Sequence, residues 1–244
     1  MQLPLPVTLP DDETFASFVA GANEQVVSLL ACVAEHSPDW REEPALAILN
    51  AASIPLVNLM GGNGKGKSHL LYAVCHQLAG REIPHVYLNC ADLIGLSPRV
   101  LDSLELLPVI CLDNLEHIRG NEAWEEAVFD LINRVSETRV GLLIFASQLG
   151  PQHSEFLLPD LRSRLSAGLT FQLQGLTDEE RGEVLSSRAL QRGLNLSEQA
   201  LHYLLNHSQR DLPSLMALLD RLDQRSLQEQ KKISVALVKR ELSE

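Results

Sequence analysis

Short apolar runs alternate with amphipathic stretches over the first 175 residues of the chain. Runs of about four to eight apolar residues between turn signals are typical of strands buried on both faces. Between two of them, the spacing of Trp124, Val128, Leu131 and Ile132 predicts an amphipathic helix over 123–135. Strands that alternate with helices in this way predict an α/β fold, a parallel sheet flanked by helices, with ligand at its carboxyl edge. The expected strand runs are 55–60, 85–90, 108–114, 140–146 and 169–173.

From Thr177 onward the pattern is helical only. Thr177 and Glu180 form a capping box that opens a helix running to about Gln191. Asp211 caps a later helix whose leucines form one stripe, and a last short helix is expected from about 234 to 242. These helices predict a small second domain. The expected division of the chain is an extended tail at 1–14, an α/β domain at 15–175 and a helical domain at 176–244.

Composition narrows the class of protein. Of the 244 residues, 45% are apolar, which is well above the content of disordered chains. The net charge of −12 argues against a protein that holds duplex DNA through its own phosphate contacts, although DNA can still be reached through a partner. The four cysteines are scattered in apolar runs, and neither a signal peptide nor a membrane-spanning run is visible. We therefore expect reduced thiols, a cytoplasmic location and no membrane partner.

A glycine-rich stretch between the first strand run and a helical stretch fits the pattern G-x-x-x-x-G-K-[ST]. In that context, backbone N–H groups and the positive end of the helix converge on one anionic site. The glycines permit a close approach of phosphate, Lys67 can reach the terminal phosphates, and the Ser68 hydroxyl can bind Mg²⁺. We expect ADP or ATP with Mg²⁺ on this loop. Its residues are Gly61, Gly62, Asn63, Gly64, Lys65, Gly66, Lys67 and Ser68, followed by His69.

A second nucleotide signature is the apolar run that ends in Asp113. The strand would carry this carboxylate to the edge of the sheet beside the glycine loop, where it can hold Mg²⁺ through water. Asn114 follows at a position where ATPases of this kind often carry a glutamate that polarises the attacking water. An amide cannot accept a proton, and the direction of Glu116 is open. We therefore expect intrinsic hydrolysis to be slow.

Three other residues have two interpretations each. Ser147 and Gln148 follow the fourth strand run, and either side chain could contact the γ-phosphate or simply begin a loop. Phe18 could belong to the core or form the wall of an adenine pocket. Residues 37–54 are interpreted as a loop and a short helix before the first strand.

The N-terminal tail alternates leucine with proline, so it cannot be helical. It is either a free tail or an extended peptide that docks in an apolar pocket of a partner, because prolines lower the entropy cost of ordering a peptide. The candidate docking residues are Gln2, Leu3, Pro4, Leu5 and Pro6.

These stretches together resemble the ATPase region of the bacterial replication initiator DnaA, in which GGNGKGKSHLL, VICLDN and LPDLRSRLSAGL stand in the same order. The resemblance is closer to the Hda family of DnaA-related regulators. That family is similar in an N-terminal Gln-Leu motif followed by LPDDETFASF, here residues 9–18, and in lacking a further DNA-binding domain. The resemblance implies an AAA+ fold in which 176–244 is a helical lid.

The resemblance also implies roles for individual residues. Gln2–Pro6 look like the motif that binds the β sliding clamp, and Arg164 matches the arginine finger. The family's sensor-2 arginine falls on Pro213, and sensor 1 falls on Ser147 or Gln148. The segment that holds adenine in the family corresponds to Phe18, Gly21 and Asn23.

Two functions follow as expectations. The first is a nucleotide-bound adaptor that docks on the clamp at DNA, donates Arg164 to the ATP of DnaA, and so inhibits re-initiation of DNA replication by regulatory inactivation of DnaA. The second is a self-contained ATPase of the helicase-loader or clamp-loader type. Asn114, Pro213 and the clamp-type tail favour the first. The sequence leaves open whether ADP or ATP is the working ligand, and whether the protein is a monomer or a homodimer.

Overall fold

The computed structural model describes residues 9–194, 196–207, 211–229 and 233–243. Contacts between Cα atoms divide the chain into two compact units. The first unit extends to Gln174 without residues 63–65, and the second comprises residues 63–65 and the chain from Gly175 onward. Gln2, Leu3, Pro4, Leu5 and Pro6, the candidate docking residues, lie outside the described residues.

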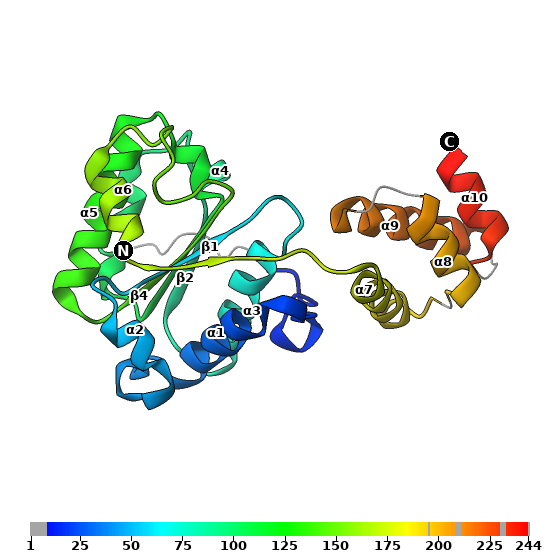
Figure 1. Ribbon diagram of the computed structural model, residues 1–244, viewed down its shortest axis with the longest axis horizontal. Helices are drawn as coiled ribbons and strands as arrows, with labels where there is room; N and C mark the ends of the chain where they lie inside the picture. Colours follow the sequence, from blue (N-terminus) through cyan, green and yellow to red (C-terminus); the bar gives the residue numbers. More distant parts are fainter. Residues whose placement is uncertain (1–8, 195, 208–210, 230–232, 244) are drawn as a thin grey trace. The chain divides into compact units, whose positions relative to one another are not determined.

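A five-stranded parallel sheet forms the centre of the first unit (Figure 1). The predicted parallel sheet is confirmed, and the strand order is β2-β3-β4-β1-β5, so that β1 is an inner strand. Each strand begins and ends within two residues of the run that predicted it. The strands are β1 (Leu56–Met60), β2 (His85–Asn89), β3 (Val109–Asp113), β4 (Leu142–Ser147) and β5 (Leu169–Gln172).

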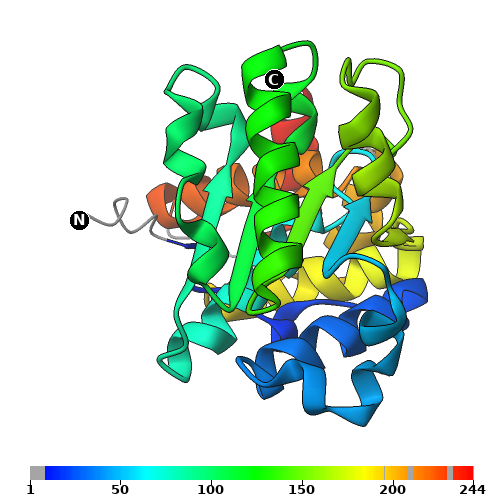
Figure 2. The ribbon, with the colours of Figure 1, turned by 90° about the vertical axis from the view of Figure 1, so that its left-hand side faces the viewer.

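Helices cover both faces of the sheet, because the inner strands carry apolar side chains on both sides. One face packs in a core with α1 (Glu24–His36) and α3 (Lys67–Gly80). The other face packs in a second core with α5 (Glu122–Thr138) and α6 (Pro159–Ser166). Figure 2 shows α5, in green, lying over this face of the sheet. Alternate residues of β4 separate in this way: Leu142, Ile144 and Ala146 belong to the first core, and Leu143 and Phe145 to the second.

Two connecting segments have less regular structure. Residues 98–106 form two 3-10 turns, Pro98–Leu101 and Leu104–Leu106, separated at Ser103, which has a positive φ of 65°. Residues 37–54 contain the 3-10 turns Trp40–Glu42 and Pro44–Leu46 and then α2 (Ala47–Ala51). Trp40, Leu46 and Leu49 of this segment are buried in the core of α1 and α3, so the segment is an integral part of the first unit.

The second unit has a hydrophobic core of its own. The predicted capping box is present at its first helix, because the Glu180 N–H donates to Thr177 Oγ1 (3.2 Å) and the Thr177 N–H donates to Glu180 Oε2 (2.6 Å). Asp211 Oδ1 accepts from the Ser214 N–H at 2.9 Å, as its capping position predicts. The helices are α7 (Asp178–Gln191), α8 (Glu198–His207), α9 (Leu212–Glu229) and α10 (Val235–Ser243).

The cysteines are free thiols in the described chain. Cys75, Cys90 and Cys111 are buried, Cys32 is half-buried, and the sulfur atoms of Cys75 and Cys111 lie 4.0 Å apart. A short four-residue helix, α4 (Cys90–Leu93), begins directly after β2. Within the described ranges, no helix has the length and apolar character needed to cross a membrane.

Candidate nucleotide-binding site

The glycine-rich loop connects β1 to α3, and its backbone conformation favours glycine. Gly64 and Gly66 have φ values of 71° and 88°, a region that side-chain-bearing residues rarely adopt. A Cβ atom on Gly66 would lie 2.6 Å from Cε2 of Phe18, whose ring packs against the loop. The same ring makes an edge-on contact with His69, with 5.1 Å between ring centroids. The structure therefore brings Phe18 and His69 to the beginning of α3.

Lys67 is folded back into this loop. Its side chain is buried, and Nζ donates to the carbonyl oxygens of Gly61 (2.7 Å) and Gly62 (2.9 Å). Burial lowers the pKa of Lys67, while the negative charges of Glu116 and Asp113 partly oppose that shift. Lys67 is thus a partly desolvated cation at the glycine loop. A phosphate bound there would stabilise its ammonium form through its negative charge.

Asp113 ends β3 at the same edge of the sheet and is almost completely buried. Its Oδ1 accepts from the Asn114 N–H (2.8 Å), and its Oδ2 accepts from the Tyr87 hydroxyl (2.8 Å). Burial, and next the charge of Asp113, raise the pKa of Tyr87, so this hydroxyl remains a donor. Tyr87 was not predicted, because it lies in a strand run that reads as plain core.

The residues present fit a magnesium ion. Mg²⁺ in nucleotide sites is held by one or two protein oxygen ligands together with phosphate oxygens and water. The hydroxyl of Ser68, in the first turn of α3, and the carboxylate of Asp113 supply hard oxygen atoms of this kind. Both residues lie at the carboxyl edge of the parallel sheet, where such ligands gather.

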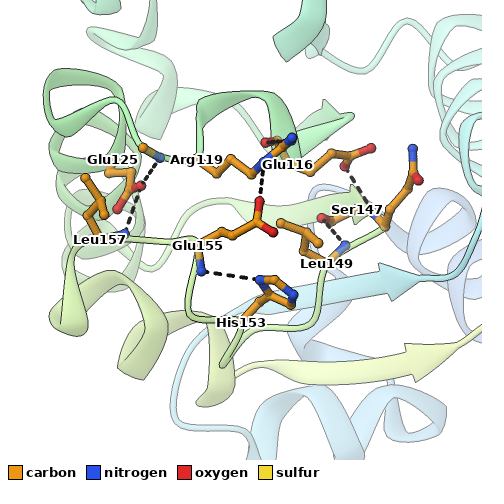
Figure 3. A network of polar contacts seen from close by, with 10 residues as sticks. Glu116, Arg119, Glu125, Ser147, Leu149, His153, Glu155 and Leu157 are labelled. Carbon is orange, nitrogen blue, oxygen red and sulfur yellow. Dashed lines mark hydrogen bonds and ion pairs between the residues drawn. The ribbon is translucent and has the colours of Figure 1, made fainter.

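Asn114 and Glu116 point in different directions. Asn114 has a left-handed backbone, and its Nδ2 donates to Asn89 Oδ1 at 3.0 Å, so its amide is held at the end of β2. Glu116 is buried, and its Oε2 accepts from the Gln148 N–H at 3.1 Å (Figure 3). Its Oε1 is buried and has no hydrogen-bond partner among the residues that the structure describes. Glu116 therefore points toward the chain that leaves β4, a direction that the sequence left open.

Ser147 and Gln148 both lie beside the glycine loop, because β4 pairs with β1 in a register that places Ser147 opposite Met60. Ser147 is buried, its Oγ accepts from the Leu149 N–H (3.0 Å), and its carbonyl accepts from the Gly61 N–H (3.2 Å). The side chain of Gln148 is exposed. The geometry is compatible with either residue as the polar contact to a γ-phosphate.

Asn23 has a structural partner in this fold. Its Nδ2 donates to the carbonyl of Gln174 (3.1 Å), and its Oδ1 accepts from the Gln174 N–H (2.8 Å). This pair ties the 3-10 turn Gly21–Asn23 to the chain directly after β5. The adenine role that the resemblance gave to Asn23 and to Gly21 stays a prediction.

Arg164 lies apart from the loop, in the last turn of α6. Leu161 and Leu165 bury one side of this short helix, whereas Arg164 is exposed and Arg162 is half-buried. Within the described part of the chain, Arg164 forms no ion pair, either with Asp160 or with any other carboxylate. Its guanidinium is therefore not paired with an acidic neighbour among the residues that the structure describes.

The sheet with its glycine loop on an inner strand, and a separate helical unit, define an AAA+ fold. Domain III of the Thermotoga maritima replication initiation protein DnaA is similar, with a TM-score of 0.80, 18% identity, and coverage of 97% of this chain and 98% of that chain. AMPPCP-bound DnaA from Aquifex aeolicus is also similar, with a TM-score of 0.70, 18% identity, and coverage of 88% and 66%. The Thermotoga maritima RuvB Holliday junction branch migration motor shares the fold, with a TM-score of 0.65, 18% identity, and coverage of 90% and 68%.

The match to the C-terminal unit is more specific than the likeness in fold. Residues 178–242 match the family model described as "Hda, lid domain". The resemblance to Hda and DnaA inferred from the sequence is thereby confirmed. The lid match and the fold both agree with that resemblance.

Replacement of Lys67 tests the nucleotide site. Lys67→Ala is expected to abolish binding of ADP and ATP, because the phosphates would lose the buried cation of the loop in a low-dielectric cleft. Titration calorimetry with each nucleotide measures this, and Lys239→Ala, at an exposed lysine of α10, is the control that should bind as wild type does. Wild-type ADP affinity in the Lys67 variant would show that nucleotide does not bind on this loop.

Proposed function

We propose that this protein is a nucleotide-bound regulator that docks on the DNA-loaded β sliding clamp and stimulates hydrolysis of the ATP bound to DnaA. Its action would prevent re-initiation of chromosome replication. The observation that carries the proposal is that Arg164 on α6 is exposed and has no ion pair among the described residues, in a chain whose lid matches that of Hda. DNA is reached through the clamp, in keeping with the net charge of −12.

The nucleotide has a supporting role in this proposal. ADP or ATP with Mg²⁺ binds on the glycine loop, with Lys67 at the phosphates and Ser68 and Asp113 at the metal. Intrinsic turnover is weak or absent, because Asn114 cannot accept a proton and its amide is held by Asn89. The bound nucleotide then serves the structure of the regulator rather than supplying energy.

Arg164 supplies the chemistry. A guanidinium stays charged at all physiological pH values and offers a planar fork of donors, so it can hold the negative charge that develops on a γ-phosphate in flight. An arginine that acts on a neighbouring protein must be exposed, and Arg164 is exposed and forms no ion pair with the described residues. Arg162, two residues earlier, is half-buried and less suited to this role.

We assign clamp binding to Gln2–Pro6 on the sequence pattern alone. The first described residues bear on how to test it, because the Pro10 carbonyl lies 2.8 Å from His76 Nε2 of α3 and Leu9 packs against the core. A truncation limited to residues 2–6 leaves these contacts in place. It therefore separates loss of the motif from damage to the first unit.

One observation favours a second candidate function, a self-contained ATPase of the helicase-loader or clamp-loader type. Glu116 places a buried carboxylate, with one oxygen unpartnered among the described residues, close enough to Lys67 to affect its pKa. Such a carboxylate could polarise water in place of Asn114. The two functions differ in whether the protein turns over its own ATP without DnaA or clamp.

Deleting residues 2–6, or changing Gln2 and Leu3 to alanine, is expected to remove clamp binding. Nucleotide affinity and the thermal unfolding midpoint should stay nearly unchanged, because the motif lies before the anchored residues Leu9 and Pro10. Surface plasmon resonance on immobilised clamp measures the first quantity. Clamp affinity at the wild-type level in the truncated protein would remove the motif from the proposal.

Arg164→Ala is expected to keep nucleotide and clamp binding but to lose nearly all stimulation of DnaA-bound ATP hydrolysis. Arginine fingers supplied in trans to nucleotidases are worth roughly 10³–10⁵ in rate. Arg162→Ala, on the same helix, is the matched control and should lose much less. The measurement is the single-turnover rate of DnaA-bound ATP with DNA-loaded clamp, and full stimulation by the Arg164 variant would place the finger elsewhere.

Turnover by the protein alone decides between the two functions. The regulator should hydrolyse ATP slowly, and Glu116→Gln should change that slow rate little. A self-contained ATPase would turn over as fast as an AAA+ motor that carries the glutamate, and Glu116→Gln would then reduce turnover by about 10² or more, as expected for loss of a general base. Radiolabelled ATP hydrolysis without DnaA and clamp measures both rates.

A further inference from the structure

Glu125 on α5 is a buried carboxylate with an unusual set of partners. Its exposed fraction is 0%. Its Oε1 accepts from the backbone N–H groups of Gly120 (2.8 Å) and Leu157 (3.1 Å) (Figure 3). Its Oε2 accepts from the N–H of Leu158 (2.8 Å). In the part of the chain that the structure describes, Glu125 has no ion pair, so both oxygens are committed to backbone.

The energetics make this a strong constraint. A buried charge is costly unless hydrogen bonds replace the water that it loses, and charge-assisted bonds are stronger than neutral ones. Three N–H groups around one carboxylate meet that requirement. Because backbone N–H groups cannot rotate away as a side chain can, the carboxylate fixes the path of the chain that carries them.

Two of those N–H groups lie where α6 begins. Leu158 is the N-cap residue of α6, and its side chain offers no capping hydrogen bond. The side chain of Leu157 is 59% exposed, so burial does not hold it in place. Phe156, just before it, is buried and supplies an apolar anchor. The polar anchor at the entry to α6 is therefore Glu125.

A second, weaker link joins the same loop to the nucleotide site. The Arg119 Nε atom lies 2.5 Å from Glu155 Oε2, and Arg119 Nη1 donates to the backbone carbonyl of Glu116 at 2.9 Å (Figure 3). Both charged side chains are roughly half exposed, and exposed ion pairs contribute little to stability. This ion pair contributes little to holding the chain before α6. The hydrogen bonds of Glu125 to Leu157 and Leu158 constrain that chain more strongly.

We propose that Glu125 is the positioning residue for α6 and thereby for Arg164. The inference rests on the proposed function, because it concerns the placement of the finger. From Leu158 to Arg164 is less than two helical turns, or about 9 Å of rise, so a change in the path of the chain at Leu158 is carried to the guanidinium. A displacement of about 1 Å at a reacting centre can cost about 10² in rate.

The test compares Glu125→Gln with Glu126→Gln. Glu126 is the next residue of α5 and is exposed, so its replacement controls for loss of one negative charge. A glutamine at 125 keeps the shape of the side chain but presents an NH₂ group to N–H donors, which leaves at least one of the three donors unpaired. Hydrogen exchange of peptides covering 149–166 should therefore be faster in Glu125→Gln, and unchanged in Glu126→Gln.

The functional readout separates positioning from general damage. For Glu125→Gln, the maximal rate of DnaA-bound ATP hydrolysis at saturating regulator should fall by about tenfold to a hundredfold. The regulator concentration for half-maximal stimulation and the ADP affinity should stay close to wild type. A purely structural weakening would instead lower the unfolding midpoint and the ADP affinity together with the rate.

Several outcomes would overturn the inference. Unchanged exchange at 149–166 would show that Glu125 does not hold the loop, and full maximal rate with a loosened loop would show that the loop does not place the finger. If wild-type protein gives no stimulation, the proposed function fails, and the positioning of a finger fails with it. The exchange result still reports separately whether Glu125 anchors the loop. If Glu125→Gln does not fold, the same two measurements on Glu125→Asp decide, with a smaller expected loss because the carboxylate is kept.

Discussion

The parallel pairing of β1 with β4 is the constraint on which the candidate site depends. Its register sets Met60 opposite Ser147, and the pairing continues one step beyond β1 in the hydrogen bond from the Gly61 N–H to the Ser147 carbonyl. The glycine loop thus starts from a fixed point inside the sheet. Since β3 lies on the other side of β4, the same pairing brings Asp113 to the edge beside Lys67. The chain leaving β4 then contacts Glu116 and Glu125 before it reaches α6. The register of β1 with β4 therefore helps to set the position of the Arg164 helix relative to the phosphate loop.

What the sequence could predict was local. The spacing of the glycine loop, the apolar run before Asp113 and the capping box at Thr177 each depend on residues close together in the chain, and the strands and helices around them are found where expected. The contacts that were missed join distant segments. Tyr87 reaches Asp113 across β2 and β3, and Glu116 reaches Gln148 over 32 residues. Their partners depend on strand order, which no spacing within one segment determines, and so neither direction could be predicted.

Phe18 and Asn23 show why a side chain assigned to a ligand can also be a structural element. Phe18 packs on the loop at Gly66, at a separation that leaves no room for a Cβ, and Asn23 bonds both backbone groups of Gln174. These contacts fix the N-terminal segment against α3 and the end of β5. A pocket wall that is held by the protein's own contacts spares a ligand the entropy cost of ordering it.

The burial of the thiols determines how fast each of them reacts with thiol reagents. A thiol reacts as its thiolate, and burial raises the pKa of Cys90 to about 12, so very little thiolate forms there near neutral pH. Cys75 and Cys111 are equally enclosed, between α3 and β3. Alkylating reagents should therefore modify half-buried Cys32 first and reach the other three only when the sheet separates from its helices. The labelling rate of those three thiols therefore measures how often the nucleotide-binding core opens.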